Sequence, residues 1–255
     1  GDYPIICENV KKAYGEHVVF SNVEFTIKRG DKVAFVGKNG EGKSTLVKCI
    51  MNEIPFDGTL KIGHNVKIGY FAQNQASLLD GEISVFDTID RVAVGDIRTR
   101  IRDILGAFMF GGEASEKKVK VLSGGEKTRL AMIRLLLEPV NLLILDEPTN
   151  HLDQDGRKQI AQYLKAKKNG FIITSHDQDF LDKVIDHSLV IEQHQLVLTR
   201  GNYSDYFIHK EQRDSTAIKK NENLLKDIHH LKQTRQAKSQ WAQQAENEKK
   251  NNSHA

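Results

Sequence analysis

The segment Gly37–Thr45, GKNGEGKST, constrains this chain more than any other, because it has the form G-x4-G-K-[ST] of a phosphate-binding loop. A short apolar run, residues 32–36, precedes it, and residues 45–50 are typical of the start of a helix. In a strand, loop and helix of this kind, the glycines let backbone N–H groups face phosphate oxygens. The plainer interpretation is a glycine-rich turn that binds nothing.

Within this loop, Lys43 would hold the β- and γ-phosphate oxygens as a point charge, and the Ser44 hydroxyl would be a magnesium ligand. We therefore expect a nucleotide and Mg²⁺ at this place. The candidate binding residues are Gly37, Asn39, Gly40, Gly42, Lys43, Ser44 and Thr45.

A second segment, residues 141–147, predicts a strand that ends in two acids. Its first five residues, NLLIL, are nearly all apolar, as expected of a strand buried on both faces of a parallel sheet. It would deliver Asp146 and Glu147 to the carboxyl end of the sheet, where ligands bind in open α/β folds. There Asp146 would orient magnesium through its water shell, and Glu147 would polarise an attacking water. Taken alone, two adjacent acids after a strand are also typical of a solvated turn.

The sequence LSGGE at 122–126 resembles the signature of the ATP-binding-cassette (ABC) family. In that family the segment opens a helix whose N-terminus meets the γ-phosphate held by the opposite cassette. The resemblance therefore implies that Ser123 and Gly125 bind nucleotide in trans. The same letters also form an ordinary helix cap, and the two interpretations are compatible.

Further residues resemble elements of the ABC family at the expected places. Tyr14 resembles the aromatic residue that stacks on adenine, and Gln73 the glutamine that touches magnesium and the attacking water. Residues 150–153 resemble the D-loop that crosses to the partner cassette, and His176 resembles the switch histidine at the γ-phosphate. The resemblance implies Glu147, His176 and Gln73 as catalytic residues, and Ser44, Gln73 and Asp146 around magnesium. Taken alone, Tyr14 fits a packing role and His176 an ordinary histidine.

The sequences of three segments resemble those of the ABC-F group. These are LLILDEPTNHLD at 142–153, the LSGGE spelling, and GNYSDY at 201–206, and the likeness covers residues 4–210. ABC-F proteins are soluble tandem-cassette ATPases, many of which act on the ribosome. The resemblance implies ATP and Mg²⁺ as cofactors and hydrolysis that needs a second cassette, in a tandem protein or a head-to-tail homodimer. It also implies a ribosome or RNA partner in translation or antibiotic resistance. The alternative is the nucleotide-binding subunit of a membrane ABC transporter.

We expect an α/β fold with an ABC-type P-loop ATPase core, an antiparallel β subdomain, a helical subdomain and a C-terminal helical tail. The ATPase domain should span residues 1–210, with antiparallel β structure at roughly 4–30 and 58–72. The helical subdomain should lie at about 75–135, with helical spacing from residue 84 to 105. The tail should span residues 211–255.

The tail holds nine Lys or Arg and six Asp or Glu residues, so the whole formal net charge of +3 lies there. Leu224, Ile228 and Leu231 form one narrow helical stripe, and the last ten residues are expected to be disordered. One interpretation is a solvated helix or half of a helical hairpin. The other is a resemblance to the start of the ABC-F interdomain linker.

The two halves of the chain resemble different cassettes of a tandem protein. The stretch from Gln73 to Leu122 is similar to a second ABC-F cassette, whereas residues 167–182 and the tail are similar to a first one. The chain could be a fragment of a tandem protein or a joining of two pieces. No apolar run approaches the ~20 residues of a membrane span, and Cys7 and Cys49 fit buried thiols in a reducing compartment. We therefore expect a cytoplasmic location and no direct membrane insertion.

Overall fold

The computed structural model describes residues 2–72, 75–150, 152–192 and 194–252. By its internal contacts the chain divides into two compact units, Gly1–Tyr206 and Phe207–Ala255, which we call the cassette unit and the tail. In the part of the chain that the structure describes, no helix combines the length and the apolar character needed to cross a membrane.

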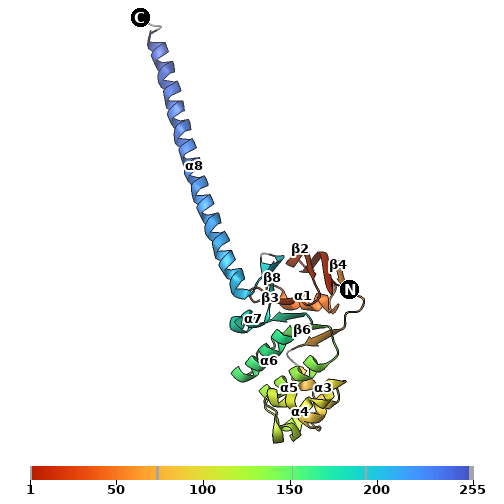
Figure 1. The fold of residues 1–255 in the computed structure, drawn as a ribbon. Helices are drawn as coiled ribbons and strands as arrows, with labels where there is room; N and C mark the ends of the chain where they lie inside the picture. Colours follow the sequence, from red (N-terminus) through yellow and green to blue (C-terminus); the bar gives the residue numbers. More distant parts are fainter. Residues whose placement is uncertain (1, 73–74, 151, 193, 253–255) are drawn as a thin grey trace. The chain divides into compact units, whose positions relative to one another are not determined.

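The cassette unit contains two sheets (Figure 1). The antiparallel sheet has the strand order β2 (His17–Ile27), β1 (Ile5–Tyr14), β4 (Asp57–Ile62). The larger sheet has the order β5 (Ile68–Phe71), β6 (Leu142–Asp146), β7 (Phe171–Thr174), β3 (Lys32–Val36), β8 (His187–Glu192), β9 (Gln195–Arg200). Its strands are parallel except β9, which runs antiparallel to β8.

The expected antiparallel segment 58–72 is divided between the two sheets. β4 pairs with β1, but β5 pairs in parallel with the apolar strand β6, so the expectation was wrong for residues 68–71. The close fit of β5 explains this placement, because a side chain at Gly69 would meet Val140, Leu135 and Leu143 at 3.0–3.2 Å. Parallel pairing therefore buries β5 against the core.

The central strands are buried on both faces, as their apolar sequences predict. Alternate residues enter two different hydrophobic clusters, since successive side chains of a strand point to opposite faces. In β6, Leu143 and Leu145 join the cluster that also contains α5 and α6 residues, whereas Leu142 and Ile144 join the cluster of the antiparallel sheet and α1. The sheet is thus a fixed platform whose carboxyl edge positions the loops that follow it.

Helices cover the sheet and form the small subdomain. α1 (Lys43–Ile50) follows β3, and α5 (Gly124–Leu137), α6 (Gln154–Ala166) and α7 (Gln178–Val184) surround the later strands. The expected helical stretch from residue 84 to 105 is three short helices, α2 (Val85–Asp90), α3 (Asp96–Thr99) and α4 (Ile101–Ala107), with 3₁₀ turns at Gln75–Leu78, Gly112–Glu116 and Val119–Val121. Within the cassette unit, α3 and α4 lie at the end opposite β2 and β4 (Figure 1). The predicted α/β fold class is confirmed.

The described part of the tail, residues 207–252, is the continuation of α8 (Tyr203–Asn252), which begins in the cassette unit. The helix includes residues 246–252, where the sequence predicted disorder. It contains no proline or glycine that would interrupt it. Leu224, Ile228 and Leu231 are all exposed in the tail, which leaves their apolar stripe facing solvent.

Candidate functional site

The phosphate-binding loop joins β3 to α1, in the context that the sequence predicts. Gly40 and Gly42 have φ angles of 85° and 103°, a left-handed conformation that favours glycine. A Cβ atom at Gly42 would lie 2.4 Å from the Val19 side chain of β2, so no larger residue fits there. The positive φ angles and the close packing on β2 fix the course of the loop, and a glycine-rich loop of this kind is typical of an anion cradle.

Lys43 lies across this loop rather than in solvent. Its Nζ donates hydrogen bonds to the carbonyl oxygens of Gly37 at 2.8 Å and Lys38 at 3.1 Å. Burial lowers the pKa of Lys43, while the negative charges of Glu147, Glu41 and Asp146 oppose that effect. The ammonium is therefore held close to the two acids that follow β6.

Asp146 lies at the carboxyl end of β6 and is fixed by the neighbouring strand. Its Oδ1 accepts a hydrogen bond from the Thr174 hydroxyl of β7 at 2.6 Å. The same hydroxyl accepts a hydrogen bond from the Glu147 backbone N–H at 3.0 Å. Burial, assisted by the Asp146 charge, raises the pKa of Tyr70 in β5 to about 12. Neither Thr174 nor Tyr70 was identified from the sequence, since only the strand order brings them beside the acids.

Glu147 has the most unusual environment in the site. Its φ angle of 49° is rare for a residue other than glycine and stores backbone strain. The side chain is only 11% exposed, and Oε1 lies 3.2 Å from His176 Nε2. Oε2 is buried with no hydrogen-bond partner among the described residues. Burial raises the pKa of Glu147, and the charge of His176 is the main opposing influence. A buried carboxylate oxygen without a partner requires a further polar group or water.

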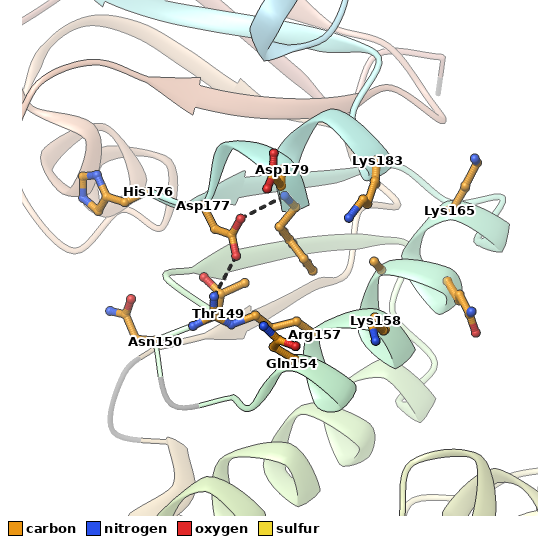
Figure 2. Close-up of a pocket in the computed structure, with 13 residues that line it drawn as sticks. Thr149, Asn150, Gln154, Arg157, Lys158, Lys165, His176, Asp177, Asp179 and Lys183 are labelled. Carbon is orange, nitrogen blue, oxygen red and sulfur yellow. Dashed lines mark hydrogen bonds and ion pairs between the residues drawn. The ribbon is translucent and has the colours of Figure 1, made fainter.

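His176 is 58% exposed. The residue that follows it, Asp177, is fixed by two interactions. Asp177 caps α7 by accepting a hydrogen bond from the Phe180 backbone N–H at 3.0 Å, and it pairs with Arg157 at 2.9 Å (Figure 2). The Arg157 Nε also donates to the Leu152 carbonyl at 3.1 Å. Arg157, which the sequence analysis did not identify, therefore joins the loop after Glu147 to the segment that carries His176.

A groove of about 790 Å³ lies between α6 and α7. Asn150 and His176 line one end, and Lys158, Lys165 and Lys183 line the rest of it (Figure 2). Because Asp177 and Asp179 also line it, the groove carries charges of both signs.

The signature segment forms the N-terminus of α5. Ser123 and Glu126 form a capping box, in which the Glu126 N–H donates to the Ser123 hydroxyl at 3.3 Å and the Ser123 N–H donates to Glu126 Oε2 at 2.7 Å. The backbone hydrogen bond from Ser123 lowers the pKa of Glu126. Further along α5, the buried Arg129 pairs with Asp153 at 2.9 Å, which connects this helix to the D-loop.

The structure brings only part of the predicted site together. Lys43, Asp146, Glu147 and His176 interact in one cluster. Tyr14 lies at the end of β1 with 52% of its surface exposed. No contact described in the structure joins Ser123 or Gly125 to this cluster. The predicted Gln73 lies outside the described residues, as does residue 151 of the D-loop.

The residues present fit a magnesium nucleotide. The glycine cradle and the charge of Lys43 suit an anionic ligand, and the partnerless Glu147 Oε2 suits a water that donates a hydrogen bond to it. Ser44 and Asp146 could hold Mg²⁺ jointly with phosphate oxygens, which is how this ion is usually bound.

Comparisons with known proteins agree on one family. Residues 20–150 match the family model described as ABC transporter. The chain is 35% identical over 201 residues to the probable ATP-binding protein YbiT of Escherichia coli O157:H7, covering 78% of this chain and 38% of that protein. It is 36% identical over 208 residues to ABC transporter F family member 2 of Arabidopsis thaliana, covering 81% of this chain and 30% of that one. The chain thus spans about a third of the length of these curated relatives.

Among solved structures, cbiO1 from Clostridium perfringens, part of the ABC transporter complex cbiONQ, superposes with a TM-score of 0.63. The match covers 86% of this chain and 96% of that one at 24% identity, which supports the fold alone.

Proposed function

Because the chain belongs to the ABC transporter family, we propose that it binds Mg-ATP and hydrolyses it when paired with a second cassette. The observation that carries this proposal is Glu147, a strained and buried carboxylate with one partnerless oxygen close to Lys43 and His176. Folding does not favour such a group, because burying a carboxylate oxygen without a hydrogen-bond partner costs free energy. Catalysis would favour it, because a water bound to that oxygen would be aimed at the γ-phosphate.

The phosphates would bind in the curl of the loop between β3 and α1. Lys43 now contacts the carbonyls of Gly37 and Lys38, and it would exchange these for phosphate oxygens without leaving the loop. Bound Mg²⁺ would neutralise charge on the β- and γ-phosphates. The hydroxyl of Ser44 and the carboxylate of Asp146 are its proposed protein ligands, together with Gln73.

In this proposal Glu147 orients the water and accepts its proton, while His176 contacts the γ-phosphate. Burial raises the pKa of Glu147, which makes it a stronger base than an exposed carboxylate. The hydrogen bond network of Thr174 fixes the backbone of Glu147 and the side chain of Asp146 at once. Strand β7 is therefore as important to the geometry as β6.

A second cassette is proposed because, among the described residues, no contact joins the signature to the catalytic cluster. Ser123 and Gly124 are exposed at the N-terminus of α5, and a helix N-terminus favours an anionic ligand. A partner would supply its own Ser123 and Gly125, or their equivalents, to the nucleotide held by this chain. The partner is another cassette of a tandem protein or a second copy arranged head to tail.

We further propose that this cassette belongs to a cytoplasmic ABC-F factor that acts on the ribosome in translation or antibiotic resistance. Support comes from the similarity to ABC transporter F family member 2 and from a helical tail rich in lysine and arginine. The alternative, a nucleotide-binding subunit of a membrane transporter, is supported by the match of residues 20–150 to the family model described as ABC transporter.

The test is ATP-dependent pairing of the Glu147→Gln variant, measured by analytical ultracentrifugation. Loss of the catalytic carboxylate should trap ATP and yield a dimer that forms only with ATP. The matched control, Lys43→Ala combined with Glu147→Gln, should stay monomeric. Pairing that is equally strong without nucleotide would contradict the proposal.

Sedimentation of the Glu147→Gln chain with purified ribosomes separates the two proposed settings. Binding that requires ATP and magnesium would support the ABC-F factor. Absence of ribosome binding, with ATP binding intact, would favour the transporter subunit or a need for the rest of the tandem protein.

A further inference from the structure

Lys12 is a buried cation to which the proposed reaction gives no role. The residue lies on β1 and is only 7% exposed, although lysine is rarely buried without a compensating partner. Its Nζ donates a hydrogen bond of 2.6 Å to the carbonyl oxygen of Pro55. No carboxylate in the described part of the chain pairs with it.

The second contact of this ammonium is the ring of Tyr14. The Lys12 Nζ lies over that ring, 4.7 Å from its centroid, which is within the range of a cation–π interaction. The two residues are two positions apart on β1, and this contact shows that their side chains lie on the same side of the strand. Tyr14 itself is 52% exposed, which leaves ring surface available for a flat ligand.

Lys12 also connects β1 to the far end of α1. Pro55 follows the C-terminal end of this helix, whose N-terminal end is the phosphate-binding loop. Burial raises the pKa of Cys49 in the last turn of α1, and the charge of Lys12 opposes this, which places the ammonium near the C-terminal end of the helix. On the neighbouring strand, Phe20 pairs with Lys12, and both Phe20 and Val19 contact the position of Gly42.

We propose that Lys12 is a positioning residue for purine binding: its ammonium fixes the Tyr14 ring at a set place relative to the phosphate-binding loop. The proposal rests on the proposed function, because it takes Tyr14 as the residue that stacks on adenine. A ring held in place before the nucleotide arrives loses less conformational entropy on binding. Lys12 therefore raises affinity for ligands that carry both a base and phosphates, and leaves affinity for bare phosphates unchanged.

The experiment compares ATP with inorganic tripolyphosphate, which has no base, by isothermal titration of the whole chain. Lys12→Met removes the charge and keeps the length of the side chain. It should weaken ATP binding about threefold to tenfold, the effect expected for one side chain that must be immobilised on binding. Tripolyphosphate affinity should change by less than about twofold by the same argument.

Two further variants separate positioning from folding. Lys12→Arg keeps a cation over the ring and should bind ATP like the wild type. Lys12→Gln keeps a donor for Pro55 without the charge, and should behave like Lys12→Met even if the methionine variant folds poorly. On a Tyr14→Ala background, Lys12→Met should have no further effect on ATP affinity, because the ring through which Lys12 acts is gone.

Three outcomes would overturn the inference. They are unchanged ATP affinity in Lys12→Met, equal losses for ATP and tripolyphosphate, and a full effect of Lys12→Met on the Tyr14→Ala background. A wild-type chain that binds neither ligand would instead remove the proposed function, and this inference with it. The failure of the proposed function is thus distinguishable from the failure of the role assigned to Lys12.

Discussion

The carboxyl edge of the parallel sheet and the N-terminus of α5 differ in how much strain and burial they contain. At the sheet edge, Glu147 is nearly buried, has a positive φ angle and keeps one carboxylate oxygen without a partner in the described structure. At α5, Ser123 and Glu126 satisfy each other in a complete capping box at the surface. The first region keeps strain and an unsatisfied polar atom at a cost in stability, as the proposed chemistry would require. The second is relaxed by itself, and its proposed role appears only when a partner presents a phosphate.

This comparison predicts different consequences for substitutions in the two regions. Changes at the sheet edge should alter the isolated chain, in nucleotide binding, stability or both. Changes at the signature should leave nucleotide binding by the isolated chain intact and reduce only the activity of the pair.

The largest effect is expected for hydrolysis after Glu147→Gln. Loss of the base that activates water should lower turnover by about 10²–10⁴-fold, while ATP affinity changes little. Phosphate release is measured at protein concentrations where pairs form. The control is Glu113→Gln, an exposed glutamate of the helical subdomain, which should keep the wild-type rate. A rate within about tenfold of wild type in Glu147→Gln would contradict the role given to this residue.

The next effect concerns Thr174, which lies between the two acids. Thr174→Val removes the hydroxyl that donates to Asp146 and accepts from the Glu147 N–H. The Asp146 carboxylate then loses a hydrogen-bond donor, whereas the Glu147 N–H keeps its bond to the Thr174 backbone carbonyl at 3.1 Å. Because the lost bond is to a charged group, the free energy of unfolding should fall by about 1–3 kcal/mol. Denaturant unfolding measures this change. Thr174→Ser keeps the hydroxyl and is the matched control; if it destabilises the chain as much as valine does, the lost methyl group rather than the hydroxyl is responsible.

A smaller effect on stability is expected at the signature. Ser123→Ala removes the side-chain cap of α5 and should cost about 0.5–2 kcal/mol, whereas Ser123→Asp, which can still cap, should cost less. Titration with ATP should show the same affinity in the isolated wild-type and alanine chains. ATP-dependent pairing in the Glu147→Gln background should weaken when Ser123→Ala is added. Reduced ATP affinity of the isolated alanine chain would break the proposed division between the two regions.

The smallest effect is a pH dependence of stability caused by Glu147. Its pKa is raised in the folded state, so protonation favours folding. The destabilisation is absent below the unfolded pKa of the carboxyl and grows as pH rises through the folded pKa. Glu147→Gln removes the charge, so its thermal midpoint should exceed that of the wild type at pH 8, with the difference shrinking toward pH 5. A difference that is constant across this range, or one that matches Glu113→Gln, would argue against a buried charge as the cause.

Much of the candidate site could be predicted because its motifs act locally. The left-handed backbone that glycine permits at Gly42, the cap at Ser123 and the apolar strand before Asp146 depend on residue type or on neighbours within a few residues. The resemblance to ABC-F cassettes, which the same segments support, is confirmed by the similarity to ABC transporter F family member 2. The mixed α/β fold class is confirmed as well.

The contacts that the sequence did not reveal join residues far apart in the chain. Thr174 reaches Asp146 across 28 positions, and Lys12 reaches Pro55 across 43. The wrong prediction for β5 has the same cause. Its partner strand β6 lies about 70 residues later in the chain, and a local sequence pattern does not reveal pairing over that separation.

By itself, the sequence determined which residues have the chemistry proposed for phosphate binding and proton transfer, and which residue caps α5, because these depend on side-chain chemistry and short-range backbone geometry. Only the tertiary structure decided that Glu147 has a strained backbone and one carboxylate oxygen without a described hydrogen-bond partner. It also decided that the Thr174 hydroxyl bonds to both acids and that the Lys12 ammonium lies over the Tyr14 ring. The physical reason is that burial and partnership depend on which strands become neighbours in the sheets, and strand order is set by packing of the whole core.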